Sequence, residues 1–329
     1  MQGTLRIMGY AFLAVLAGCA SAPKRTAEVI PPRRQPLTTQ QRDSLLNAVG
    51  SIQRLTDEGQ DGAVRAAFNQ LKKDLPQIAE FDLNLFANAE VSLARHKYDT
   101  AAKDFQKVVD DYPESELRPP ALVRLFKIGC SYLDGRALYS LVLFKIPGYD
   151  RGIEILDKVS EEVGLEDPNG LGVKGAAAVA RSYERRGMAE EAYLKWSEIA
   201  AVWDAGPLGR DALLGMAQNK LNAYTRHPAH RRHLYDGANL TAARTYYLKF
   251  KDLYPQDANQ MDVDRIVQQI DQDMAHKQLA IGRYYQRTGR LQAANLYFDM
   301  VVREWPDTQA AQTAREALSA ERAKAAKDP

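Results

Sequence analysis

Several features that are scarce in this sequence of 329 residues restrict what the protein can be. It has only two cysteines, Cys19 and Cys130, which are too few for a disulfide framework or a structural zinc site. Its 44 basic and 42 acidic residues leave a formal net charge of only +2, so the overall charge gives no support to nucleic-acid binding. Sequence signals for β-strands are scarce too. Since alanine, leucine, glutamine, arginine and glutamate are abundant, the composition predicts an all-α protein.

The two most apolar segments are both too short for a typical membrane-spanning helix. The first, Ile7–Ala17, has about eleven residues and follows the single charged residue Arg6, which are the proportions of a secretory signal peptide. It ends in Leu-Ala-Gly-Cys at positions 16–19, which resembles the bacterial lipobox, where small residues precede a diacylated cysteine. We therefore predict that residues 1–18 are a lipoprotein signal peptide, that Cys19 is lipidated, and that the mature protein is anchored to a membrane.

The segment after the predicted anchor, residues 19–38, contains four prolines and little hydrophobic periodicity. It is expected to form a flexible tether to a folded domain at residues 39–329, whose first helix opens with a capping box at Thr38 and Gln41. Ala20 follows the cysteine where an aspartate would favour inner-membrane retention, so by resemblance to the enterobacterial sorting rule the outer membrane is favoured. The alternative is an ordinary signal peptide cut after Ala20 or Ala22.

A pattern of small, aromatic, aliphatic and proline residues recurs along the folded part. In the last copy Ala294, Phe298 and Val301 share one face of a helix, and Pro306 ends that helix. The upstream copies are Val64-Phe68-Leu71-Pro76, Ala101-Phe105-Val108-Pro113, Gly152-Leu156-Val159-Gly164, Ala192-Trp196-Ile199-Asp204 and Ala243-Tyr247-Phe250-Pro255. Recurrence in this register indicates a repeat protein.

The full unit resembles the tetratricopeptide repeat, a helix–turn–helix of about 34 residues. Gly282, Tyr285 and Gly289 occupy its other signature positions in the last copy. The resemblance predicts an all-α superhelical solenoid of about five to six helix pairs with a C-terminal capping helix near 308–325. The alternative is an ordinary helical bundle with chance spacing.

Two insertions interrupt the repeats, near 135–148 and 227–238. The first is the most apolar stretch after the signal, and it either covers core or forms a hydrophobic lid or partner-binding patch. The second contains His227, His230 and His233, a spacing that could bind zinc. Pro228 and two neighbouring arginines argue against a metal ion, so a basic loop facing an acidic partner, or simply a solvated loop, is expected.

The sequence contains no constellation of residues typical of a catalytic site. Gly170, Gly172 and Gly175 spell G-x-G-x-x-G, but a helix and Pro168 precede them where the dinucleotide fingerprint needs a strand. These glycines are expected to form a loop between repeats. We therefore predict no enzyme activity, no cofactor, no metal ion and no small-molecule substrate.

Tetratricopeptide arrays bind peptides on a concave face lined by the first helix of each pair, and the resemblance implies such a groove here. In the early repeats it would be apolar, lined by Leu83, Phe86, Leu93, Val123, Phe126 and Leu133. In the later repeats it would be basic, lined by Lys174, Arg181, Arg185, Arg283 and Arg287. An apolar groove suits an extended hydrophobic segment, and a basic groove suits an acidic domain. The alternative is that the apolar residues pack against the insertion at 136–147.

The lipobox, the proline-bearing tether and the helix pairs together resemble the outer-membrane β-barrel assembly lipoprotein of BamD type. The resemblance covers roughly residues 60–320 and is strongest at residues 275–318, which include the run Trp-Pro-Asp-Thr-Gln-Ala at 305–310. It implies a non-enzymatic, lipid-anchored scaffold on the periplasmic side of the outer membrane. The late repeats would bind the periplasmic domains of the barrel subunit, and the early repeats unfolded outer-membrane protein segments.

The chain is longer than members of that family, and its two insertions leave the geometry of partner binding open. Another envelope machine is therefore the alternative, such as a pilus or secretion pilotin or the cell-division machinery. A peptidoglycan-linked accessory protein is a further class, which binding to purified sacculi would distinguish.

Overall fold

The computed structural model describes residues 37–76, 81–140 and 144–325, so the predicted signal peptide, Cys19 and most of the tether lie outside the described residues. The helices are α1 (Thr39–Asp57), α2 (Asp61–Asp74), α3 (Phe81–Ala94), α4 (Tyr98–Asp111), α5 (Arg118–Leu133), α6 (Tyr149–Val163), α7 (Leu171–Arg185), α8 (Ala189–Val202), α9 (Gly206–Thr225), η2 (Ala229–Leu234), α10 (Ala238–Leu253), α11 (Pro255–Gln260), α12 (Val263–Arg287), α13 (Leu291–Glu304) and α14 (Gln309–Ala325).

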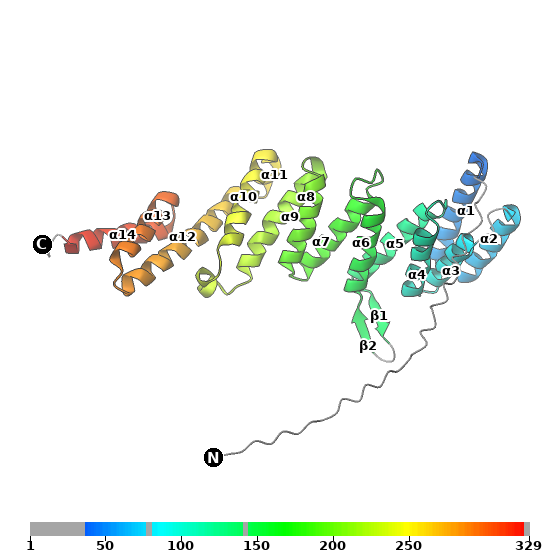
Figure 1. Ribbon diagram of the computed structural model, residues 1–329, viewed down its shortest axis with the longest axis horizontal. Coiled ribbons are helices and arrows are strands. Elements are labelled where there is room, and N and C mark those ends of the chain that lie inside the picture. Colours follow the sequence, from blue (N-terminus) through cyan, green and yellow to red (C-terminus); the bar gives the residue numbers. More distant parts are fainter. Residues whose placement is uncertain (1–36, 77–80, 141–143, 326–329) are drawn as a thin grey trace, which may run out of the picture.

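The helices pack in sequence order as an elongated array, with α1 and α14 at opposite ends (Figure 1). Six antiparallel pairs follow one another, α1/α2, α3/α4, α5/α6, α7/α8, α9/α10 and α12/α13, and α14 packs on the last pair. Each helix contacts mainly its neighbours, which is the arrangement of a solenoid. The predicted tetratricopeptide solenoid with a C-terminal capping helix is confirmed.

The repeated small–aromatic–aliphatic pattern forms the core. Its members on the second helix of each pair are almost completely buried, as Ala101, Phe105 and Val108 illustrate at 0% exposure each. Phe86 bridges adjacent pairs, because its ring meets those of Phe68 and Phe105 edge-on at centroid distances of 6.2 and 5.3 Å. The predicted capping box also forms: the backbone N–H of Gln41 donates to Thr38 Oγ1 at 3.3 Å, and the backbone N–H of Thr38 donates to Gln41 Oε1 at 3.0 Å.

A buried charged network ties the first helices of three consecutive pairs together. Arg124 on α5 donates from Nε and Nη2 to the two carboxylate oxygens of Glu90 on α3, at 2.8 and 2.9 Å. It also donates to the backbone carbonyl of Gln53 at 2.9 Å and pairs with Asp57, the last residue of α1. Arg124 and Glu90 are 1% and 0% exposed, so their pairing replaces the water that both charges lost on folding.

The first insertion departs from the helical pattern, because it forms a β-hairpin. Strands β1 (Ala137–Ser140) and β2 (Phe144–Pro147) pair antiparallel, with Leu138 opposite Ile146. The hairpin projects from the array beside α5 and α6 (Figure 1). Tyr139, Phe144 and Ile146 are aromatic or β-branched residues, which favour strands. The side chains of residues 138–147 lie outside the described part, so whether they cover core or bind a partner stays a prediction.

The tight turns inside α1/α2, α3/α4, α7/α8 and α12/α13 use a left-handed backbone, and among these four turns only that of α3/α4 has a residue other than glycine there, His96. Gly59, Gly187 and Gly289 have φ of 74, 71 and 74° at this position, and His96 has φ of 58°.

A side chain such as that of His96 costs about 1–2 kcal/mol in this left-handed region. Because glycine loses more freedom on folding, replacing His96 with glycine is expected to stabilise the protein by a net ~0.5–1 kcal/mol. Thermal unfolding measures the change in stability. Gly187→Ala is the control in the opposite direction and should lower the Tm, because it puts a side chain in the left-handed region. A lower Tm for His96→Gly would contradict the prediction.

Candidate partner-binding surface

The predicted apolar groove of the early repeats is largely wrong. Leu83 and Phe86 are both 0% exposed and Leu133 is 3% exposed, so all three are core residues and line no surface. The reason is that α3 contacts α1, α2 and α4 together, which covers more of its circumference than the assumed open face allows. Leu93 is half-buried against the same core, and Phe126 packs beside Leu133.

Val123 is the member of the apolar set that stays open, at 41% exposure. One exposed valine does not make a hydrophobic groove, since isolated apolar side chains are normal on protein surfaces. The early repeats therefore offer much less apolar surface than the sequence suggested.

Three of the predicted basic residues lie exposed on α7, but each has a partner within the chain. Lys174 donates to the Asn169 carbonyl at 3.3 Å. Arg181 lies 3.9 Å from an Asp211 oxygen. Arg185 donates to the carbonyl of Leu133 at 3.1 Å. Their charges are thus partly satisfied inside the solenoid.

Arg283 and Arg287 differ, because neither has an ion-pair partner among the described residues. Both are exposed on the C-terminal half of α12 and line a cavity of about 520 Å³ between α12 and η2. The cavity is lined by His233, Leu234, His276, Lys277, Leu279, Ala280, Ile281, Arg283, Tyr284, Tyr285 and Arg287. The predicted late basic groove and the predicted basic loop thus meet at one place, which we call the α12 surface.

Hydrogen bonds from two basic side chains to backbone carbonyl groups hold the second insertion in place. Lys277 Nζ on α12 donates to the carbonyls of His233 and Tyr235, the first at 3.2 Å. Arg232 donates to the His227 carbonyl at 2.9 Å and to the Thr225 carbonyl at 2.8 Å. These contacts fix η2 against α12, so the α12 surface is formed by an ordered segment.

Two of the three histidines of this insertion make ring contacts. His227 stacks on Tyr235 with 3.6 Å between ring centroids, and His233 meets His276 edge-on at 5.5 Å. Within the described ranges no three histidine, cysteine or carboxylate side chains gather as metal ligands would. Burial lowers the pKa of His233, and the nearby positive charges of His276 and Lys277 add to this. The lasting positive charge of the α12 surface therefore comes from Lys277, Arg283 and Arg287.

Large apolar side chains stand next to these cations. Leu234 is 70% exposed, Tyr284 54% and Tyr235 40%. Arginine and aromatic residues are the types enriched at protein interfaces, and they carry much of the binding energy there. The α12 surface thus combines exposed anchors with two arginines, Arg283 and Arg287, that have no ion-pair partner among the described residues, and this combination suits contact with another protein.

The repeat pattern predicts Arg283 and Arg287 as surface residues of the groove, but it does not indicate Leu234, Tyr284 and Lys277. Leu234 follows the histidine cluster in a loop that looked merely basic, and nothing in its sequence indicates that η2 packs on α12. Tyr284 could have been found, since it neighbours Arg283 on the same helix. None of the helices in the described part of the chain is both long and apolar enough to cross a membrane.

The fold defines the class of the protein, a tetratricopeptide-repeat solenoid, which here carries a basic and aromatic surface near its C-terminal end. A tetratricopeptide-repeat family model matches residues 89–115, which contain α4. A second family model, YfiO, described as outer membrane lipoprotein, matches residues 212–327 and so includes the whole α12 surface. No curated protein matches the chain. The chain is thus a tetratricopeptide-repeat protein whose C-terminal part is similar to outer membrane lipoproteins.

Proposed function

We propose that this protein is a non-enzymatic, periplasm-facing scaffold lipoprotein of the machinery that assembles β-barrel proteins in the outer membrane. The observation that carries the proposal is the position of the α12 surface. An exposed set of arginine and aromatic side chains lies inside the segment, residues 212–327, that matches the outer membrane lipoprotein model. Solenoids present such extended surfaces to bind other proteins.

The N-terminal sequence supports an anchored scaffold. Residues 1–18 would be removed, and lipidated Cys19 would hold the protein on the membrane. The tether at residues 19–38 would reach about 70 Å at most if fully extended, because each residue spans at most about 3.3–3.6 Å. The folded domain at residues 39–329 could then meet partners that stand well away from the lipid headgroups.

The partner proposed for the α12 surface is a periplasmic domain of the barrel subunit with an acidic face. Arg283 and Arg287 would each pair with carboxylates, and Leu234 and Tyr284 would provide apolar anchors. Nascent outer-membrane protein segments are the second proposed partner. Support for that role in the early repeats is reduced to the exposed Val123 and the half-buried Leu93 and Phe126, because the other predicted residues are core.

A crosslinking pull-down from envelope membranes tests the proposal. The double substitution Arg283→Glu and Arg287→Glu is expected to reduce recovery of the barrel subunit at least about tenfold, because it places like charges against an acidic face. Cys19→Ala is expected to reduce recovery by removing the anchor.

The matched control replaces two exposed arginines outside the cavity with glutamate. They are Arg265, at the other end of α12, and Arg303 on α13. It is expected to leave recovery unchanged. If a secretin or a division protein dominates the wild-type sample in place of the barrel subunit, the scaffold serves another envelope machine and the proposed function is wrong.

A further inference from the structure

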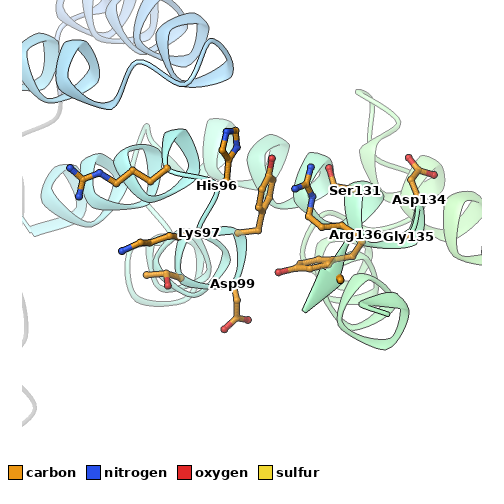
Figure 2. A pocket seen from close by; sticks show the side chains of 12 residues that line it. His96, Lys97, Asp99, Ser131, Asp134, Gly135 and Arg136 are labelled. Atoms are coloured by element: carbon orange, nitrogen blue, oxygen red, sulfur yellow. The ribbon is translucent and has the colours of Figure 1, made fainter. Parts of the chain in front are cut away.

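A larger cavity, of about 1160 Å³, lies in the early repeats, far along the chain from the α12 surface. It forms where the turn between α3 and α4 meets the end of α5 and the start of β1. Residues 95–100, 131–132 and 134–137 supply its lining (Figure 2). The cavity lies outside the segment that matches the outer membrane lipoprotein model, so the proposed function does not account for it.

An arginine in this cavity is held in position by an aromatic ring. The guanidinium carbon of Arg136 lies 3.6 Å from the ring centroid of Tyr98. His96 stacks on the same ring, with 6.2 Å between centroids and 15° between planes. Stacking orients the planar guanidinium and leaves its N–H edge available for hydrogen bonds. An oriented arginine loses less entropy when it binds a ligand.

The positive charge in this cavity exceeds the negative charge that could neutralise it. Arg136 and Lys97 are exposed, and neither has an ion-pair partner among the residues that the structure describes. Arg95, by contrast, already donates to Asp61 at 2.6 Å. Two cations are therefore left without a counter-charge.

The acidic side chains of the lining do not supply that counter-charge. Asp99 pairs with Lys103 at 2.6 Å and with Arg151 at 3.2 Å. Figure 2 shows the Asp99 side chain pointing away from the side on which His96 and Arg136 project. Asp134 is exposed and lies 3.7 Å from Arg185.

We propose that this cavity is a second docking site, which binds an acidic peptide segment of a protein partner. Arg136 takes one carboxylate through two parallel N–H···O bonds, and Lys97 takes a second. The hydroxyls of Thr100 and Ser131 line the same cavity and can donate to the bound segment. The volume exceeds the ~300–1000 Å³ typical of small-molecule sites, which favours a stretch of polypeptide over a metabolite.

Fluorescence anisotropy with a fluorescein-labelled octaglutamate peptide tests this site. The protein is the full chain in detergent, carrying Arg283→Ala and Arg287→Ala so that the α12 surface does not contribute. In that background Arg136→Ala is expected to weaken octaglutamate binding at least about tenfold, since a charge-assisted hydrogen-bonded contact is lost. Arg136→Lys keeps the charge but loses the planar fork, so it is expected to weaken binding severalfold.

The matched control is Arg65→Ala, an exposed arginine on α2 that does not line the cavity. It is expected to bind octaglutamate within about twofold of the background protein, because surface charges remote from the site contribute little. Equal binding by the background and Arg136→Ala proteins would overturn the proposal. Equal losses for Arg65→Ala and Arg136→Ala would also overturn it, since they would show diffuse charge attraction. Neither outcome depends on whether the barrel subunit binds the α12 surface.

Discussion

Replacing Arg124 with alanine is expected to destabilise the N-terminal half of the solenoid by about 3–5 kcal/mol. The side chain is 1% exposed and makes two hydrogen bonds to the carboxylate of Glu90, which is itself fully buried. Removing the guanidinium leaves that carboxylate in the core without its counter-charge. The loss should concentrate in α1, α3 and α5, which the network joins, because each repeat contacts mainly its neighbours.

Urea unfolding and amide hydrogen exchange measure this effect. Exchange should accelerate in α1, α3 and α5 and change little in α12 to α14. The control is Arg95→Ala, which breaks the exposed pair with Asp61 and is expected to cost under about 1 kcal/mol. Replacing both partners, as Arg124→Met with Glu90→Leu, should recover most of the loss. A single Arg124→Ala variant as stable as the wild type would show that the pair is not the buried link inferred from its geometry.

Replacing Gly172 with alanine is expected to cost about 3 kcal/mol or more at the junction of α6 and α7. A Cβ atom at Gly172 would lie 2.0 Å from the carbonyl oxygen of Gly164 and 2.9 Å from its carbonyl carbon. Both are backbone atoms, so no side-chain rotation can relieve the clash, and the two helices must move apart. Ser160 Oγ donates to the Gly172 carbonyl at 2.9 Å, and that contact would be disturbed as well.

Thermal unfolding of Gly172→Ala beside Gly62→Ala checks this prediction. Gly62 is an exposed residue of α2, and no heavy atom lies within 4 Å of a Cβ built there. Alanine at Gly62 is expected to be neutral or to stabilise by up to about 1 kcal/mol, because alanine favours a helix. If Gly172→Ala unfolds at the wild-type temperature, the close approach of the two helices is not required.

The G-x-G-x-x-G motif illustrates how a short pattern can mislead without its structural context. Gly170 has φ of 67° and precedes the first residue of α7, Gly172 admits the Gly164 carbonyl, and a Cβ at Gly175 would lie 3.0 Å from Ser160 Oγ. The turn and the close packing of α6 on α7 therefore account for all three glycines. The prediction that these glycines form a loop between repeats holds for Gly170 but is wrong for Gly172 and Gly175, which belong to α7.

The sequence by itself determined the repeat architecture. The small–aromatic–aliphatic spacing fixes which face of each second helix is buried, because periodicity alone places Ala294, Phe298 and Val301 on one side. Proline and glycine then set where most of these helices end and turn. These are local properties of the chain, so they could be predicted without knowing what lies opposite.

Only the tertiary structure decided which side chains remain available to a partner. Leu83 and Phe86 satisfied the expected spacing for an open face but are buried, because α3 is covered by three helices. Arg181 and Arg287 look alike in sequence, yet Arg181 has a carboxylate nearby and Arg287 has none among the described residues. The contacts of Arg124 with Glu90, of Arg136 with Tyr98 and of η2 with α12 join segments far apart in the chain. Exposure and pairing depend on such long-range packing, and residue spacing along one helix carries no information about it.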